Sequence, residues 1–293
     1  MTLSAPPGSA QAGGPRASNL ALRVASAAVL APVTLAVAYV GGWIFYILCA
    51  TAAGGILWEW VSLASHRADP RVLAPGWLAL LAALLLIGLG FPAGSMGAVA
   101  IGAVVAGSVV AASPRPTDEA AAAIWAAGGV VYAGALLIAP SMLRSDPQWG
   151  LLALLFLFAN VWATDIFAFF CGRAIGGPLL WPRVSPKKTW AGAVGGLAGG
   201  VAASVAVAYA SGIGKLGIVG VMACVLSVLA QAGDLFESAV KRHFGAKDAS
   251  HLIPGHGGLM DRLDGFLVAA VAALLIGIIH QGIAAPARGL LVW

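Results

Sequence analysis

The residues best suited to chemistry gather in two short stretches near the C-terminal end of the 293-residue chain. The first is "QAGDLFESAVKRHFGAKD" (231–248). If it is helical, Asp234, Ser238, Lys241 and Arg242 lie at i, i+4, i+7 and i+8 and share one face, with Glu237 as a second carboxylate beside it. An ion-paired amphipathic helix end would look similar. Carboxylates this close to an apolar run, however, are costly unless they are paired or line an aqueous site.

The second stretch, "IPGHGGLMDRLDG" (253–265), places carboxylates and glycines before the last long apolar run. Asp261 and Asp264 are spaced i, i+3 at a predicted helix start, where the helix dipole alone could favour acidic residues. The glycines around His256 allow the backbone to approach a ligand closely. Together with Asp234, these two carboxylates form a predicted cage for Mg²⁺, which typically binds one or two carboxylates plus water and phosphate oxygens.

A third stretch, "SPKKTW" (185–190), carries two adjacent cations just before another apolar run. Lys187 and Lys188 at a helix N-terminus form a predicted anion site, because their charge and the helix dipole act together. Lysines at a membrane surface also attract anionic lipid head groups, and the sequence leaves both interpretations open.

Two further carboxylates, Asp165 and Glu59, lie inside apolar runs. Carboxylates within a membrane span are functional candidates by default. Either could instead be a structural lock held by hydrogen bonds, an interpretation that suits Glu59 better than Asp165. A transporter that uses both residues to relay protons or bind substrate is the alternative from another functional class.

The elements that must position these groups are membrane helices. The chain is 60% hydrophobic and only 9% charged, with a mean hydropathy of +0.94, whereas soluble domains carry about 25% charged residues. Apolar runs of about 20 residues match the thickness of a bilayer core. We therefore predict an all-α polytopic membrane protein with about nine spans, at roughly 20–40, 43–65, 73–90, 93–112, 120–140, 149–171, 190–211, 214–232 and 265–285.

The distribution of Lys and Arg along the chain predicts the orientation of these spans. With the N-terminus inside, 13 of the 16 basic residues fall on the cytoplasmic side, and only Arg144, Lys215 and Arg288 fall outside. This bias favours nine spans with a cytoplasmic N-terminus and a periplasmic C-terminus; eight spans, the alternative, would break the alternation of the connections.

The chain divides into three predicted parts: a disordered head rich in Pro, Gly, Ala and Ser (1–18), about five N-terminal transmembrane helices (19–140) and a catalytic transmembrane region (141–293). Two long cytoplasmic connections, 172–189 and 233–264, belong to the last part. Long polar loops on one face of a bundle are where function tends to lie.

The string "SAVKRHFGAKDASHLIPGHGGLMDRLD" (238–264) resembles the signature of the phosphatidate cytidylyltransferases, also called CDP-diacylglycerol synthases. It contains Ser-x-x-Lys-Arg, then Lys-Asp, His-Gly-Gly and Asp-Arg-x-Asp. "GDLFES" (233–238) and "SPKKTW" extend the resemblance over roughly 160–270. Members usually have Glu-Gly after that Trp, and this chain has Ala191-Gly192.

The resemblance implies a bacterial inner-membrane enzyme, with its active site facing the cytoplasm, that joins CTP to phosphatidic acid and gives CDP-diacylglycerol and pyrophosphate. It implies dependence on Mg²⁺, with one or two ions, and a homodimer; nucleic acid is not among the expected partners. A related CTP-dependent transferase acting on another lipid phosphate remains the alternative within enzymes.

The residues and the resemblance together predict three sets of site residues. The predicted catalytic residues are Asp234, Lys241, Arg242, His256, Asp261 and Asp264. Those predicted to bind the phosphates of CTP or the lipid head group are Ser185, Lys187, Lys188, Arg173, Lys247, Gly257, Gly258 and Arg262. The predicted metal ligands are Asp234, Asp261 and Asp264, with Asp165 as a further candidate.

Overall fold

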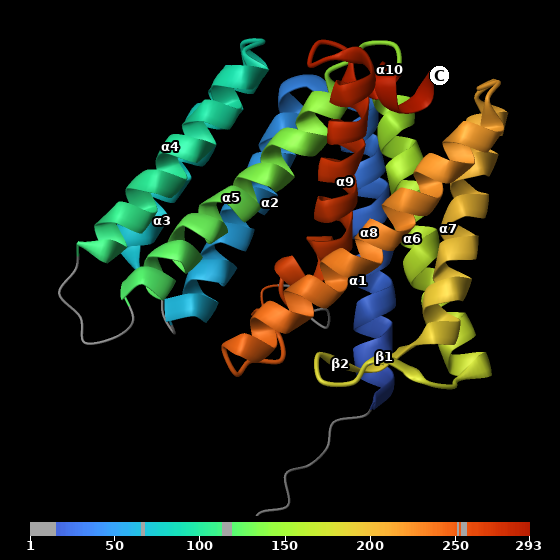
Figure 1. Cartoon of the computed structure of the whole chain (residues 1–293), viewed down its shortest axis with the longest axis horizontal. Helices are drawn as coiled ribbons and strands as arrows, with labels where there is room; N and C mark the ends of the chain where they lie inside the picture. The colour runs from blue at the N-terminus through green and yellow to red at the C-terminus, as the bar shows by residue number, and fades with distance from the viewer. Residues whose placement is uncertain (1–15, 66–67, 113–118, 251, 253–256) are drawn as a thin grey trace, which may run out of the picture.

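The protein is a helical bundle with one small two-stranded sheet (Figure 1), and the computed structural model describes residues 16–65, 68–112, 119–250, 252 and 257–293. The all-α membrane architecture is confirmed. In lipid, backbone N–H and C=O groups must bond within the protein, so apolar runs of this length form helices. The elements are α1 (Arg16–Val40), α2 (Gly42–Ser65), α3 (Pro70–Gly88), α4 (Pro92–Ala111), α5 (Glu119–Arg144), α6 (Gly150–Ile175), β1 (Leu179–Trp181), β2 (Ser185–Thr189), α7 (Trp190–Ala210), α8 (Leu216–His243), α9 (Met260–Gln281) and α10 (Pro286–Leu291).

Eight helices, α2 to α9, are long and apolar enough to cross a membrane within the part of the chain that the structure describes. They correspond to eight of the nine predicted spans. The remaining span, 20–40, falls on α1, a helix of 25 residues. Its described apolar portion, Ala28–Val40, is shorter than the eight spanning helices.

Several element boundaries differ from the sequence-based prediction. Helix α8 continues to His243 instead of ending near 232, and α9 begins at Met260 instead of 265. Half of the predicted polar loop 233–264 therefore consists of helix ends, which a shorter connection, 244–259, joins. Helix α1 begins at Arg16, inside the predicted head, and the rest of that head lies outside the described residues.

The predicted loop 172–189 contains the end of α6 and an antiparallel hairpin made of β1 and β2. Leu179 pairs with Thr189, and Trp181 pairs with Ser185. The Thr189 side chain accepts a hydrogen bond from the backbone N–H of Gly192 at 3.1 Å and so caps the start of α7. This cap fixes the hairpin to a membrane helix.

Small residues and buried polar groups hold α6, α7 and α8 together. A Cβ on Gly196 would lie 2.7 Å from the carbonyl oxygen of Thr164, so only glycine permits this approach of α7 to α6. Buried Asn160 of α6 donates to Ser204 Oγ of α7 at 2.9 Å and to the carbonyl of Ala223 on α8 at 3.0 Å. These three helices thus form a tightly joined scaffold.

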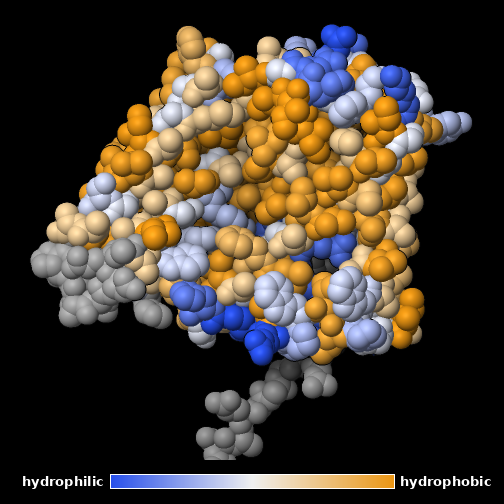
Figure 2. All heavy atoms as spheres, viewed as in Figure 1, coloured by the Kyte–Doolittle hydropathy of each residue, from blue (hydrophilic) through white to orange (hydrophobic). Residues whose placement is uncertain are grey.

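The polar ends of the bundle differ in what they carry. The hairpin and the start of α1 lie at one end, and α10 lies at the other (Figure 1). Figure 2 shows a hydrophobic band across the middle of the bundle, with hydrophilic residues gathered toward both ends and in a hollow near the hairpin. Chemistry that needs polar groups is therefore expected at the hairpin end, where α8 ends and α9 begins.

Candidate active site

Three carboxylates from α8 and α9 meet at one point. Each of Asp234, Glu237 and Asp264 offers an oxygen atom, and these oxygens all lie within 4.8 Å of one another. Glycines make this meeting possible: a Cβ on Gly233 would lie 2.8 Å from the backbone oxygen of Asp264, and one on Gly265 would lie 3.1 Å from that of Ala230. The two helices therefore approach closely where the carboxylates project.

Lys188 links the hairpin to this carboxylate cluster. Its Nζ lies 2.5 Å from Oδ2 of Asp234, and both side chains remain partly exposed. Because the hairpin is attached to the cap of α7, Lys188 is delivered to the cluster by a short and well-anchored segment. The stretch "SPKKTW", for which an anion site was predicted, thus lies in contact with the carboxylate cluster.

A second cation, Lys241, lies on the inner side of the cluster. It is buried, and its Nζ lies 2.6 Å from Oε2 of Glu237 and also contacts Oδ1 of Asp261. The prediction that α8 continues as a helix and turns Asp234 and Lys241 to the same site is consistent with these positions. A cation buried between two carboxylates offsets part of their negative charge in a largely apolar bundle.

Asp261 has surroundings different from those expected of a metal ligand. One of its oxygens pairs with Lys241, and the other accepts backbone N–H groups from Ala249 at 3.1 Å and Gly258 at 2.8 Å. Both oxygens are therefore occupied by donors from the protein. Glu237, which sequence reasoning noted only as a neighbouring carboxylate, takes the third place in the cluster instead.

Glu59 reaches this region from the N-terminal half of the chain. Its carboxylate accepts hydrogen bonds from the backbone N–H groups of Leu259 and Met260 at the start of α9, and from the Ser250 hydroxyl. Glu59 has no solvent exposure. The hydrogen bonds expected of a structural lock are therefore present at Glu59.

Asp165 of α6 lies near the cluster without joining it by a described hydrogen bond. It is close enough to Asp234, Lys188 and Arg262 for their charges to interact. Arg262, one of the predicted phosphate-binding residues, therefore belongs to the same neighbourhood.

Other predicted site residues lie around the cluster or outside the described residues. Arg242 is exposed and donates to the carbonyl of Ala246, which closes the end of α8 instead of facing the carboxylates. Ser185 and Lys187 lie on β2, Arg173 in the last turn of α6, and Lys247 in the connection after α8. Gly257 has a φ of +85° and comes just before Gly258, which bonds to Asp261. His256 lies outside the described residues.

An aromatic residue near the carboxylate cluster, Tyr132, was not predicted from the sequence. Tyr132 of α5 packs against Trp60 and Phe236, with ring centroids 5.0 and 6.2 Å apart. Its buried hydroxyl has no hydrogen-bond partner among the described residues, and it is close enough to Asp264 and Glu237 for electrostatic interaction. No motif marks Tyr132, so only its position in space connects it to the site.

The cluster has the composition that a divalent metal requires. Mg²⁺ binds carboxylate oxygens and keeps several positions for water and phosphate. Oε1 of Glu237 is buried and has no hydrogen-bond partner within the described structure, and an oxygen in that condition is destabilising unless a cation or water meets it. The residues present therefore fit a divalent metal, with Asp234, Glu237 and Asp264 as its holders.

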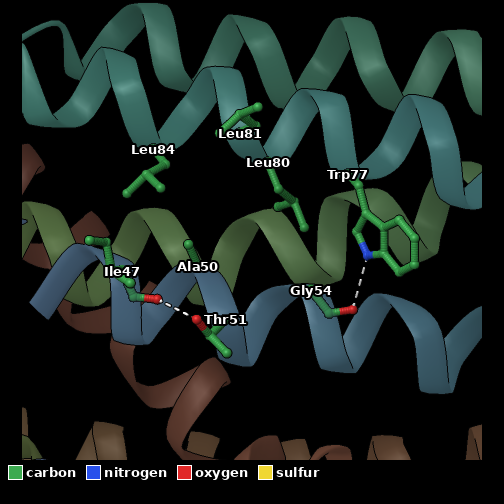
Figure 3. Close-up of a pocket in the computed structure, with 8 residues that line it drawn as sticks. All are labelled: Ile47, Ala50, Thr51, Gly54, Trp77, Leu80, Leu81 and Leu84. Carbon is green, nitrogen blue, oxygen red and sulfur yellow. Dashed lines mark hydrogen bonds between the residues drawn. The ribbon is translucent and has the colours of Figure 1, made fainter. Parts of the chain in front are cut away.

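A separate cavity between α2 and α3 has a different character (Figure 3). It measures about 240 Å³ and is lined mainly by apolar side chains such as Ile47, Leu80 and Leu84. Its polar side chains are already bonded: Thr51 donates to the carbonyl of Ile47, and Trp77 donates to that of Gly54. This cavity offers no charged group and is not a candidate for phosphate chemistry.

Comparison with known proteins agrees with the chemistry of the cluster. Residues 21–279 match the sequence profile of the cytidylyltransferase family. A phosphatidate cytidylyltransferase of Brucella abortus biovar 1 (strain 9-941) is 42% identical over 265 residues, which cover 89% of this chain and 94% of that protein. Proteins of the same name from Haemophilus influenzae and Staphylococcus haemolyticus are 44% and 40% identical over 47% and 42% of this chain, and over 50% and 47% of their own lengths. The match covers most of the chain, including both carboxylate-bearing helices, and the chain therefore belongs to the cytidylyltransferase family.

Proposed function

We propose that this protein transfers the cytidylyl group of CTP to phosphatidic acid, giving CDP-diacylglycerol and pyrophosphate. The observation that carries the proposal is the cluster of Asp234, Glu237 and Asp264, flanked by Lys188 and Lys241 in a membrane bundle. The family match and the names of the similar proteins support the choice of substrates. The alternative of a transporter needs Glu59 to relay protons or bind substrate. Both oxygens of Glu59 already accept hydrogen bonds from the protein, which argues against that role.

The reaction requires positioning and charge neutralisation more than proton transfer. An oxygen of the phosphatidic acid phosphate attacks the α-phosphorus of CTP, and the bond from that phosphorus to the bridging oxygen of the β-phosphate breaks. Pyrophosphate leaves with the electron pair. Because the phosphate monoester is already anionic near neutral pH, the site needs no strong general base to activate it.

The residues of the chain divide this work between them. Asp234, Glu237 and Asp264 would hold Mg²⁺, which when bound neutralises phosphate charge and polarises the α-phosphorus. Lys188, partly exposed beside Asp234, is placed to pair with an incoming phosphate. Lys241 is buried between carboxylates, so its role is to keep Glu237 and Asp261 in place.

The membrane setting follows from the same proposal. The hairpin end would face the cytoplasm, where CTP is found, and the lipid would enter from the inner leaflet of a bacterial inner membrane. Arg173, Lys187 and Arg262 would add positive charge around the entrance. We also propose a homodimer, on the family resemblance alone.

The direct test is an assay with the purified protein in detergent, CTP labelled at the α-phosphate, and phosphatidic acid. We expect label in a chloroform-soluble product, unlabelled pyrophosphate, no product in EDTA, and recovery on addition of Mg²⁺. Full turnover in EDTA would rule out the metal. Label transfer to another lipid phosphate with none to phosphatidic acid would favour the related transferase. CTP labelled at the γ-phosphate serves as the control, because its label must stay in the aqueous pyrophosphate.

A further inference from the structure

We propose that Glu59 is a positioning residue that fixes the start of α9 and thereby the carboxylates of Asp261 and Asp264. The proposal rests on the proposed function only for the measurement of kcat; Mn²⁺ affinity and thermal unfolding do not depend on it. Oε1 of Glu59 accepts from the N–H of Leu259 at 2.7 Å and from the Ser250 hydroxyl at 2.5 Å, and Oε2 accepts from the N–H of Met260 at 2.6 Å.

These bonds supply what the first turn of α9 lacks. The first N–H groups of a helix have no partner within the helix. The residue before α9, Leu259, gives no side-chain cap. A carboxylate on another helix meets this need, and its charge also suits the positive end of the helix dipole. Two oxygens bound to two successive N–H groups fix the rotation of the helix start as well as its position.

The residues fixed in this way include Asp264, a member of the carboxylate cluster. Asp261 follows Met260 directly, and Asp264 lies one turn further along α9. A small rotation of that turn would move Asp264 away from Asp234 and Glu237, because the three ligand oxygens span no more than 4.8 Å. Glu59 therefore acts on the carboxylate cluster through the backbone of α9.

The carboxylates of Glu59 and Asp261 both accept hydrogen bonds from backbone N–H groups of the segment 258–260. Glu59 holds the N–H groups of Leu259 and Met260, whereas Asp261 holds that of Gly258. A Cβ on Gly258 would lie 2.8 Å from Oε1 of Glu59 and 3.0 Å from Oδ2 of Asp261. Glycine at this position lets both carboxylates approach, which explains the second glycine of "HGG" in physical terms.

The burial of Glu59 makes the arrangement sensitive to a small change. A carboxylate with no exposure is stable only while its oxygens are bonded. In Glu59→Gln, one oxygen becomes an NH₂ group, which places a donor against a backbone or hydroxyl donor. Glu59→Asp keeps both acceptors and the charge on a side chain shorter by one methylene, so part of the grip should remain.

The test compares these two variants with the wild type and with Ser204→Ala. Ser204→Ala also removes a buried interhelical hydrogen bond, from Asn160, but leaves α9 untouched. Three quantities are measured on purified full-length protein in detergent: Mn²⁺ affinity by electron paramagnetic resonance, kcat for cytidylyl transfer, and the midpoint of thermal unfolding.

Loss of a group that orients a metal ligand typically lowers metal affinity by about 10- to 100-fold. We expect a loss of that order in Mn²⁺ affinity for Glu59→Gln, with a parallel loss in kcat, and a smaller loss of both for Glu59→Asp. Ser204→Ala should lower the unfolding midpoint and leave Mn²⁺ affinity unchanged.

Folded Glu59→Gln with the Mn²⁺ affinity and kcat of the wild type would overturn the proposal, leaving Glu59 a purely structural lock. If Glu59→Gln does not fold, Glu59→Asp decides: wild-type Mn²⁺ affinity with a lowered unfolding midpoint would also overturn it. Mn²⁺ binding needs neither CTP nor lipid. An inactive wild type that binds Mn²⁺ in a Glu59-dependent way would therefore contradict the proposed reaction and not the role of Glu59.

Discussion

Lys188 of the hairpin and Asp234 of α8 form a 2.5 Å ion pair between segments that the sequence separates by a whole transmembrane helix. The pair joins the stretch "SPKKTW" to the carboxylate cluster and leaves both side chains partly exposed. It therefore marks the place where substrate phosphate and metal would meet the protein.

Replacing Lys188 should weaken substrate use without unfolding the bundle. A charge-assisted hydrogen bond contributes about 1.5–3 kcal/mol, so Lys188→Gln should lower kcat/KM for CTP by roughly tenfold or more in steady-state assays. Arg183→Gln is the matched control, because it removes an exposed cation from the turn of the same hairpin. Equal losses in both variants would mean that only the overall charge of the hairpin matters.

The Glu237 carboxylate should be needed for metal binding, in the place that the sequence-based prediction gave to Asp261. Glu237→Gln preserves shape and removes charge, and the loss of such an electrostatic group lowers kcat by about 100-fold or more. We also expect a higher Mg²⁺ concentration for half-maximal activity, measured by Mg²⁺ titration. Asp146→Asn serves as control, because that carboxylate lies in the link between α5 and α6 and accepts from the N–H groups of Gln148 and Trp149 there. A normal Mg²⁺ titration for Glu237→Gln would return the third ligand position to Asp261.

Asp261 and Lys241 should act as a unit. Asp261→Asn is expected to lower turnover by roughly 100-fold, as removal of a charge from the site should. Lys241→Met leaves Asp261 and Glu237 without their shared cation and should give a loss of similar size. Because the two residues are in contact, the double variant should lose little more than either single one. Fully additive losses would show that Asp261 works independently of Lys241.

The approach of α8 to α9 should depend on Gly233. A new Cβ there would lie 2.8 Å from the backbone oxygen of Asp264, which cannot move aside as a flexible side chain can. Gly233→Ala should therefore destabilise the protein by about 1–3 kcal/mol, seen as a lower unfolding midpoint, and should weaken Mn²⁺ binding. Gly220→Ala on the same helix meets only Val205 at 3.6 Å, an ordinary contact, and should be neutral or stabilising. A harmless Gly233→Ala would mean that the helices can separate without cost.

Topology can be tested with fusions. A reporter placed after Trp293 should be periplasmic, and reporters within 172–189 and 244–259 should be cytoplasmic. The expectation rests on the basic residues at the hairpin end and on the positive-inside bias. A cytoplasmic C-terminus would mean that α1 does not cross the membrane.

The transmembrane architecture was predictable because hydropathy requires only local information. Apolar runs such as 149–171 predict a membrane span whatever residues surround them. The helical spacing of Asp234 and Lys241 likewise places both on one side of α8. Boundaries were less accessible. Helix α9 starts earlier than its apolar run, and the N–H groups of Leu259 and Met260 at this start bond to Glu59 of α2, a contact that no local pattern contains.

The residues of the candidate site could be predicted from the sequence, but the contacts between them could not. Which of Glu237 and Asp261 joins the carboxylate cluster depends on how α9 is rotated against α8, and Gly233 and Gly265 set that approach through backbone contacts. The hairpin, too, is a tertiary feature: "LLWPRVSPKKT" has few residues in regular pairing, and its position depends on the Thr189 cap. Contacts between residues far apart in the sequence therefore determine the pairings, which the spacing of the motif residues could not predict.

The partners of Glu59 have a consequence for how the protein is made. Leu259 follows Glu59 by 200 positions in the chain. At a synthesis rate of about 5–20 residues per second, roughly 10–40 s separate their emergence from the ribosome. During that interval α2 carries a carboxyl group whose donors do not yet exist. Until α9 arrives, water or the insertion machinery has to meet that carboxyl group, because a polar group buried without a partner is costly. Assembly of the carboxylate cluster is therefore timed by the synthesis of α9, long after α2 has been made.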